Sequence, residues 1–564
     1  MKLKNLKYIP MAGLAIALTG CDDFLDHTPD NRVIISTPTQ VTQLLVDAYS
    51  DGNHATICEL SSDNIVDNTS PDENGVRYNL AGYSNFAPAD DEAFAWEEIK
   101  SGIQQDSPSH VWANAYHAIA VCNYALQAIE KLEAEGRGDE VTAQKGEALI
   151  SRAYHHFILA NLFCLPYAGP EASKSIPGVP YMTGIETEVK PQYNRGNLAD
   201  VYDKIEQDIK NGLPLVDDNL HPLAPKYHFT RKSANAFAAR FFLFARKYDL
   251  AEKYASIALG GEGAPSQMRS FWKGTYSTSE SLIQAWVSVA DPGNLMLIPT
   301  SSLYYRIVGG KYAHNREAKN ATTHSAGPTW GRNTSFHPCM SGKLYYRGQS
   351  EYGSIFGPMM EFFEYTDKIA GIGYVHHIRP EFTVEEVLLT RAEARIYMRK
   401  TDLAIADLRA WDGNRWKDLP VSDKPDCEFT IEAVNSFYRD NDPGNGIVKP
   451  INIEQVCPAP NSAWAFGADI EPLVQCVLHF RRLERLDMGD RWFDIRRNGI
   501  EITHKIGRSR SETLTLGDPR RVFQIPADVL SAGFPENSRI PTDNGAGNAT
   551  LSTEDYRKPL PVLP

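Results

Sequence analysis

The fold is decided by a short stretch that occurs twice, first as Arg246-Lys-Tyr-Asp-Leu-Ala251 and then as Arg399-Lys-Thr-Asp-Leu-Ala404. Small and apolar residues at helical spacing surround the first copy: Ala238, Leu243, Tyr248, Ala251, Tyr254, Ala258 and Leu259. This spacing is that of a tetratricopeptide hairpin of about 34 residues, in which small side chains let two helices approach closely. The sequence therefore predicts helical hairpins that stack on one another.

A second repeated stretch supports the same fold class. Glu147-Ala-Leu-Ile-Ser-Arg-Ala153 recurs as Glu386-Val-Leu-Leu-Thr-Arg-Ala392. Apolar residues at i, i+3 and i+4 predict further helices over residues 111–132, 141–163, 198–215, 384–398, 404–411 and 473–495. We therefore expect a mainly α protein with a tetratricopeptide-like, helical-repeat scaffold.

Two long segments differ from these helices, residues 58–108 and residues 260–380. Both are rich in Gly, Ser, Asn, Pro and aromatic residues. Long loops in a compact protein are usually functional or disordered, and disordered segments are poor in aromatics. We therefore expect an irregular, loop-rich face that carries the ligand-binding residues.

The N-terminus has the order of a targeting sequence. Lys2, Lys4 and Lys7 precede an apolar run over residues 9–18, which is too short to span a bilayer. The run ends in Leu-Thr-Gly-Cys21, which resembles the lipobox of bacterial lipoproteins. This resemblance implies a signal peptide over residues 1–20 and acylation of Cys21, which would anchor the chain to a membrane. An ordinary secretory signal with a chance cysteine is the alternative.

Charge and cysteine content exclude several classes of partner. The formal net charge is -14, whereas nucleic-acid binding needs clustered Lys and Arg, so we expect no nucleic-acid partner. The seven cysteines after Cys21 show no C-x-x-C spacing, which argues against a zinc site or a disulfide framework. Cys122, Cys164 and Cys476 lie in apolar helical runs and are predicted to be buried. A disulfide among Cys339, Cys427 and Cys457 stays open.

One C-terminal block carries a resemblance to a known family. It is the stretch His479-Phe-Arg-Arg-Leu-Glu-Arg-Leu-Asp-Met-Gly-Asp-Arg-Trp-Phe-Asp-Ile-Arg-Arg-Asn-Gly499. This block resembles the signature of the SusD/RagB family of outer-membrane nutrient-binding lipoproteins. It departs from that signature at Asp487-Met-Gly-Asp, where a glutamate-rich stretch is commoner. Residues 147–169, residues 382–394 and the stretch from Phe523 to residue 539 also resemble the family.

The resemblance implies a cell-surface protein on the outer membrane, lipid-anchored and facing the exterior. It implies an oligosaccharide or polysaccharide ligand and a partner, a SusC-like TonB-dependent transporter to which cargo is delivered. It further implies one domain over residues 21–564, with an N-terminal part at about 21–260, a loop-rich insert at about 261–380 and a C-terminal part at about 381–564.

Other functions stay open at this point. Peptide cargo, a surface glycan hydrolase and a repeat-built adhesin are the alternatives to glycan import. The sequence has neither a G-x-S-x-G nor an H-E-x-x-H motif, so nothing specific favours an enzyme. We therefore expect a binding protein without a catalytic residue.

The ligand residues are predicted from chemistry, because no motif maps them. Flat aromatic side chains cover the apolar faces of sugar rings, while planar polar groups bond the hydroxyls in pairs. The preferred residues are Trp96, Trp272, Tyr304 and Trp330, together with Tyr78, Tyr83 and Arg306. Packing within the loops is the alternative role for each of them.

The C-terminal block itself is predicted to be structural. Leu483, Leu486 and Phe493 form one helical stripe. Helical spacing allows three ion pairs beside it, Glu484 with Arg481, Asp487 with Arg491 and Asp494 with Arg497. The block therefore predicts a packed helix laced by ion pairs, which supports the fold and does not contact ligand.

Metal sites are only weakly indicated. Residues 63–75 collect oxygen ligands suited to Ca²⁺ but lack the spacing of a calcium loop, so a turn-rich loop is the favoured interpretation. His155-His156 and His376-His377 are adjacent pairs, whose rings point apart on a helix or strand. We therefore expect no cofactor, with a Ca²⁺ ion as the alternative.

Overall fold

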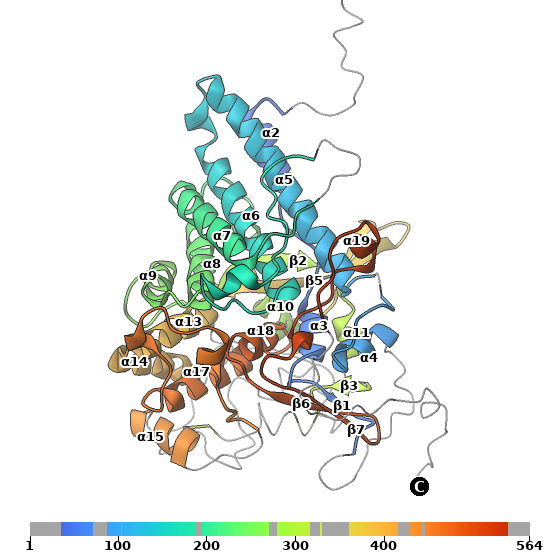
Figure 1. The fold of residues 1–564 in the computed structure, drawn as a ribbon. Coiled ribbons are helices and arrows are strands. Elements are labelled where there is room, and N and C mark those ends of the chain that lie inside the picture. The colour runs from blue at the N-terminus through green and yellow to red at the C-terminus, as the bar shows by residue number, and fades with distance from the viewer. Residues whose placement is uncertain are drawn as a thin grey trace, which may run out of the picture.

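The structure is a computed structural model. The described residues are 35–71, 87–102, 104–186, 193–269, 279–308, 310–315, 318, 327–329, 360–414, 429–440 and 446–539. The fold is mainly helical, with short antiparallel sheets to one side (Figure 1). The predicted fold class is confirmed.

The helices fall into a long array and a set of short connecting elements. The array consists of α5 (Pro108–Ala134), α6 (Thr142–Phe163), α7 (Leu198–Gly212), α8 (Arg231–Phe244), α9 (Tyr248–Leu259), α13 (Val384–Tyr397), α14 (Thr401–Gly413), α17 (Glu471–Glu484) and α18 (Asp490–Arg497). The short helices are α2 (Pro38–Leu45), α3 (Ala55–Leu60), α4 (Pro88–Phe94), α10 (Ser279–Trp286), α11 (Tyr304–Ile307), α15 (Ile431–Asn435), α16 (Ile453–Val456) and α19 (Ala527–Ser531).

The array is built from neighbouring helical hairpins. Helix α5 packs on α6, α6 on α7, α8 on α9, α9 on α13, and α13 on α14 and α17. Figure 1 shows the long helices α5 and α6 at one end, followed by the green helices α7 to α9 and the orange helices α13, α14 and α17. One large hydrophobic cluster runs through these helices. The predicted stacking of tetratricopeptide-like hairpins is confirmed.

The two copies of the opening repeat form the same turn. Arg246 and Arg399 precede α9 and α14, and each has a left-handed backbone, with φ of 56° and 58°. The Arg246 side chain donates to the Cys457 carbonyl and pairs with Glu454 at 2.6 Å. Beside it the rings of Tyr248 and Tyr397 stack with centroids 4.4 Å apart. The repeated turns therefore join the two hairpins directly.

The second repeat places an equivalent ion pair in each copy. On α6, Arg152 donates to both oxygens of Asp208, at 2.8 Å each. On α13, Arg391 donates to both oxygens of Asp407, at 2.7 and 3.0 Å. All four side chains are buried, and each pair ties a helix to the next helix of its hairpin. The repeat in sequence is thus a repeat in structure.

The strands form three antiparallel sheets. They are β1 (Val66–Asp67), β2 (Asn294–Thr300), β3 (Tyr312–Ala313), β4 (Phe362–Asp367), β5 (Ile372–Thr383), β6 (Ile502–Ile506) and β7 (Arg510–Leu514). The largest sheet has the order β2-β5-β4, with Leu297 opposite Pro380 and Glu364 opposite Tyr374. The other two sheets pair β1 with β3 and β6 with β7.

The two segments predicted to be irregular contain regular structure. Residues 58–108 include the end of α3, β1 and α4, and residues 260–380 include α10, α11, β2, β3, β4 and most of β5. Gly373 and Pro380 lie inside β5, and both residue types are disfavoured in strands. The composition of this segment therefore did not predict β5. The strand is stabilised by its pairing with β2 and β4.

The helix predicted over residues 473–495 is two helices, α17 and α18. Between them Asp487 and Gly489 have left-handed backbones, with φ of 66° and 86°. A Cβ atom at Gly489 would lie 3.0 Å from the Ala55 Cα and 3.1 Å from the Cys58 Cβ. The close approach of α3 and the two left-handed residues break the helix, which apolar spacing alone did not reveal.

The predicted core cysteines are confirmed. Cys122, Cys164 and Cys476 are buried free thiols, as is Cys457. Cys339 and Cys427 lie outside the described residues. Among the described helices, none has the length and apolar character that crossing a membrane requires.

Candidate ligand-binding surface

Several predicted residues lie outside the part of the chain that the structure describes. Tyr78, Tyr83, Trp272 and Trp330 lie outside the described residues, as does Cys21. The structure describes the remaining three residues, Trp96, Tyr304 and Arg306. Trp96 and Tyr304 are buried, whereas Arg306 is exposed.

Trp96 belongs to the core. Its side chain is 2% exposed, its ring stacks on His504 with centroids 4.2 Å apart, and its indole N–H donates to the Ser61 carbonyl at 2.8 Å. A ring covered in this way offers no face to a sugar. The prediction of a ligand platform at Trp96 is wrong, because the turn that follows α4, where Trp96 has a left-handed backbone with φ of 53°, directs the ring into the interior.

Tyr304 is also buried, with 0% exposure. Its hydroxyl donates to the Asp487 carboxylate at 2.5 Å. Burial and the charge of Asp487 raise the pKa of Tyr304, while burial and the same Asp487 raise the pKa of Glu59 to about 8. The prediction of a ligand platform at Tyr304 is therefore wrong as well, because its side chain stabilises the turn between α17 and α18.

Arg306 lies at the surface, with its side chain 50% exposed. Its guanidinium donates to both oxygens of Glu361, at 2.6 and 2.9 Å. Glu361 directly precedes β4, so Arg306 lies at the base of the hairpin that β4 forms with β5. This placement keeps Arg306 within reach of a ligand bound there.

The β4–β5 hairpin carries a concentration of exposed aromatic side chains. Phe363, Tyr365 and Tyr374 are 49%, 52% and 51% exposed. In the described part of the chain the other exposed large aromatics are Tyr124 and Tyr193, which lie on α5 and before α7. A concentration of exposed apolar surface marks an interaction site rather than ordinary surface.

The register of the hairpin arranges these rings on two faces. Phe363 and Tyr365 share one face, and their ring centroids are 4.8 Å apart. A Cβ atom at Gly373 would lie 2.7 Å from the Phe363 ring, so glycine leaves room for this ring to cover the neighbouring strand. On the other face the Tyr374 hydroxyl donates to Glu364 at 2.8 Å.

This arrangement combines the two elements that sugar recognition needs. The aromatic rings offer apolar faces, and carboxylate, hydroxyl and guanidinium groups lie beside them to bond hydroxyls. The signal in the sequence was the alternation Phe363, Glu364, Tyr365, which fits a strand with aromatic residues on one face.

The C-terminal block is buried and makes structural contacts, as predicted. Arg491 donates to both oxygens of Asp63, at 2.7 and 2.9 Å. Burial acts to raise the pKa of Asp63, but Arg482, Arg491 and Lys449 outweigh it and hold that pKa well below its usual value. Asp63, the first acid of the stretch considered for Ca²⁺, is thus already neutralised by protein cations.

The local ion pairs predicted for this block are mostly replaced by long-range ones. Asp494 does pair with Arg497, at 2.6 Å. Arg481, however, pairs with Glu393 on α13 at 2.7 Å, and Glu484 pairs with Arg269 at 3.1 Å. The side chains face neighbouring elements instead of solvent, so tertiary packing selects their partners.

Comparison with known proteins gives one match to a family model. Residues 23–243 match the sequence model of a SusD-like family described as "Starch-binding associating with outer membrane". Over these residues the chain is similar to SusD-like proteins. No curated protein matches it.

Solved structures of SusD superfamily proteins share the fold of this chain. A SusD superfamily protein from Bacteroides fragilis is similar with a TM-score of 0.54 at 16% identity, covering 89% of this chain and 99% of its own. One from Bacteroides thetaiotaomicron gives 0.53 at 16% identity, covering 90% and 100%. One from Bacteroides vulgatus gives 0.52 at 16% identity, covering 91% and 100%. At these identities the likeness establishes the fold alone.

Proposed function

We propose that this protein captures glycans at the outer face of the outer membrane and delivers them to a SusC-like TonB-dependent transporter. The family description, starch binding in association with the outer membrane, supports both the ligand class and the location. In this proposal the acylated Cys21 anchors the chain, and the protein binds its cargo without chemical change.

The observation that carries the proposal is the exposed aromatic hairpin. Phe363, Tyr365 and Tyr374 leave about half of each side chain in solvent, although burying such rings would be favourable. A sugar ring supplies an apolar face, and the hairpin and its base also carry polar groups that can bond hydroxyls, Glu364 beside Tyr374 and Arg306 beside Glu361.

The first experiment measures retention on a panel of immobilised polysaccharides. Phe363→Ala, Tyr365→Ala and Tyr374→Ala are compared with Tyr124→Ala, a matched exposed aromatic on α5. Each hairpin variant should lose about twofold to tenfold in affinity, because an aromatic contact contributes about 0.5–1.5 kcal/mol beyond area burial. Melting temperatures should stay near wild type for all four. Equal retention by the hairpin variants and wild type would move the site elsewhere.

A second variant tests the arrangement of the rings. In Gly373→Val, the Cβ atom of the branched side chain would overlap the Glu364 carbonyl oxygen. It would also lie 2.7 Å from the Phe363 ring. The hairpin should distort and retention should fall while the helical array keeps its melting transition. A Cβ atom at Gly263 would meet no other atom within 4 Å, so Gly263→Val provides the control.

The remaining parts of the proposal have separate tests. Cys21→Ala should release the protein from the membrane fraction, and a variant that stays there with a processed mass argues against acylation. Co-purification of a large outer-membrane transporter with the wild-type protein tests the partner. Release of reducing sugar from any polysaccharide that is retained would contradict a purely binding role.

A further inference from the structure

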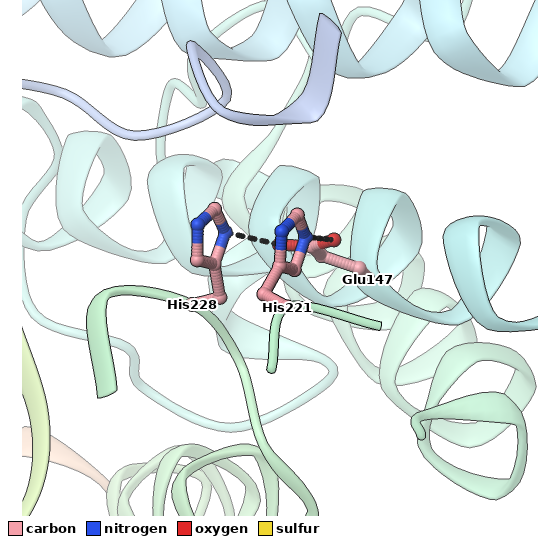
Figure 2. A group of neighbouring side chains, drawn as sticks. All are labelled: Glu147, His221 and His228. Atoms are coloured by element: carbon pink, nitrogen blue, oxygen red, sulfur yellow. Dashed lines mark hydrogen bonds and ion pairs between the residues drawn. The ribbon is translucent and has the colours of Figure 1, made fainter. Parts of the chain in front are cut away.

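Three side chains outside the aromatic hairpin converge on one point, as Figure 2 shows: Glu147, His221 and His228. Glu147 lies on α6, while His221 and His228 lie in the connection between α7 and α8. The His221 ring nitrogen Nε2 is 2.8 Å from one carboxylate oxygen of Glu147, and the His228 Nδ1 is 2.9 Å from the other. One ligand atom from each residue lies within 4.8 Å of the other two.

The three side chains of this cluster are largely buried. The side chains of Glu147, His221 and His228 are 1%, 11% and 8% exposed. The two imidazole rings stack with centroids 3.4 Å apart and planes within 5°. Both rings therefore present a nitrogen to the carboxylate from the same side.

Tyr49 orients the carboxylate from a third segment. Its hydroxyl donates to Glu147 at 2.6 Å and accepts from the backbone N–H of Phe229 at 2.9 Å. A partner that fixes a metal-ligating side chain in this way is typical of metal sites.

The internal repeat shows what is unusual about Glu147. Its counterpart in the second copy, Glu386, faces the guanidinium of Arg240 at 3.3 Å. In the described residues, by contrast, the basic groups in contact with Glu147 are the two imidazoles. Within this part of the chain, Glu147 therefore lacks the guanidinium partner that its counterpart Glu386 has.

A buried negative charge needs a compensating positive charge. At Glu386 a guanidinium stands beside the carboxylate, whereas the groups beside Glu147 are two imidazoles, which are common metal ligands. Imidazole and carboxylate together are ligands that Zn²⁺ and related divalent transition metals prefer.

We propose that Glu147, His221 and His228 bind a divalent transition-metal ion of the Zn²⁺ class. A tetrahedral ion about 2.0–2.2 Å from each ligand sets the ligand atoms about 3.4 Å apart. The present separations of 2.8 and 2.9 Å would lengthen by only about 0.5 Å. On binding, the proton on each facing nitrogen moves to the other nitrogen of the same ring, which leaves both imidazoles neutral.

The proposed ion would fasten the α7–α8 connection to α6. At Gly146 a Cβ atom would lie 2.7 Å from the backbone of Leu215 and Val216, so this connection already crosses α6 at close range beside Glu147. The role is structural, and it is independent of glycan capture.

The experiment uses the purified chain, ZnCl₂ and EDTA at constant pH. Metal analysis after dialysis should find about one equivalent of zinc, and zinc should raise the melting temperature while EDTA reverses the shift. His221→Ala, His228→Ala and Glu147→Gln should each weaken zinc binding at least tenfold, and Tyr49→Phe about tenfold. The control His117→Ala removes an exposed histidine and should bind like wild type.

Co²⁺ gives a second readout that does not depend on thermal stability. A visible absorption spectrum typical of four-coordinate Co²⁺ should appear with wild type and His117→Ala and be lost in the three ligand variants. Failure of wild type to bind zinc, or equal binding by the ligand variants that remain folded, would overturn the proposal. Either result would leave the glycan-binding proposal untouched, because that is tested on the hairpin.

Discussion

The α17–α18 block and the β4–β5 hairpin differ in almost every physical respect. In the block, Trp492 is 1% exposed, and the Arg496 guanidinium donates to the carbonyls of Asn161, Cys164 and Arg521. In the hairpin, Phe363 and Tyr365 are about half exposed, and their ring centroids lie 4.8 Å apart. The block thus joins distant parts of the chain, whereas the hairpin presents side chains to solvent.

This difference explains why a sequence motif indicates the family but does not indicate the ligand-binding residues. Buried guanidinium groups require fixed acceptors, so the block contains a dense and recognisable pattern of charges. Exposed aromatics need no fixed protein partner, and no motif marks them. The motif that resembles the family therefore supports the fold, while the candidate ligand surface lies where no motif was found.

The largest effect should come from removing apolar packing in the block. Trp492→Ala together with Phe493→Ala deletes two buried aromatic rings, each worth about 3–5 kcal/mol. Their sum approaches the whole stability of a typical protein, so the double variant should melt far below wild type or fail to fold. Thermal unfolding followed by circular dichroism measures this.

The matched control is Phe363→Ala with Tyr365→Ala, the same number of aromatic rings removed from the hairpin. This control should melt near wild type. If instead the block variant kept its melting temperature and lost only glycan retention, the block would be a ligand site.

A smaller effect on stability, which depends on pH, is expected from the buried charges. Glu393 pairs with Arg481 at 2.7 Å and Arg497 at 2.6 Å. Burial acts to raise the pKa of Glu393, but the two guanidinium groups outweigh it and lower that pKa to about 2 from an ordinary 4.5. Because the folded pKa is depressed, this stabilisation is present above pH 4.5 and is lost as the pH falls toward 2.

Glu393→Gln should therefore cost up to about 3–5 kcal/mol at neutral pH, because it removes one of the two buried anions, Glu393 and Asp494, that Arg481 and Arg497 share. The difference in melting temperature between wild type and variant should narrow as the pH is lowered from 4.5, over the range in which wild type stays folded. Glu364→Gln on the exposed hairpin should show no such narrowing. A difference that is constant with pH would contradict the assignment.

Trp96 should behave like the block and unlike the hairpin. Trp96→Ala removes a buried ring and the hydrogen bond to the Ser61 carbonyl, at a cost of about 3–5 kcal/mol. Any loss of glycan retention should then follow the unfolded fraction. Retention lost at full folding would restore Trp96 as a ligand residue.

The smallest effect is expected at the base of the hairpin. Arg306 and Glu361 form a partly exposed ion pair, and such pairs contribute about 0–1 kcal/mol. Arg306→Ala should therefore change the free energy of unfolding, measured by denaturant titration, by less than about 1 kcal/mol. A larger loss would show that this ion pair holds the hairpin in place.

The sequence by itself determined the fold class and most helix positions. Apolar spacing located α5, α6, α7 and α13 within a few residues, and the repeated turns at Arg246 and Arg399 identified the hairpins. These features depend on residues close in sequence, so local periodicity carries them. Spacing also predicted the local ion pair of Asp494 with Arg497.

Only the tertiary structure decided which aromatic side chains are exposed and which charges meet. Trp96 and Phe363 both lie in aromatic-rich segments, yet one is 2% and the other 49% exposed. His221 and His228 meet Glu147 across 74 and 81 positions of the chain, in a cluster that no spacing rule indicated. Burial and contact at such separations depend on how helices and strands pack, and periodicity within one element holds no information about that packing.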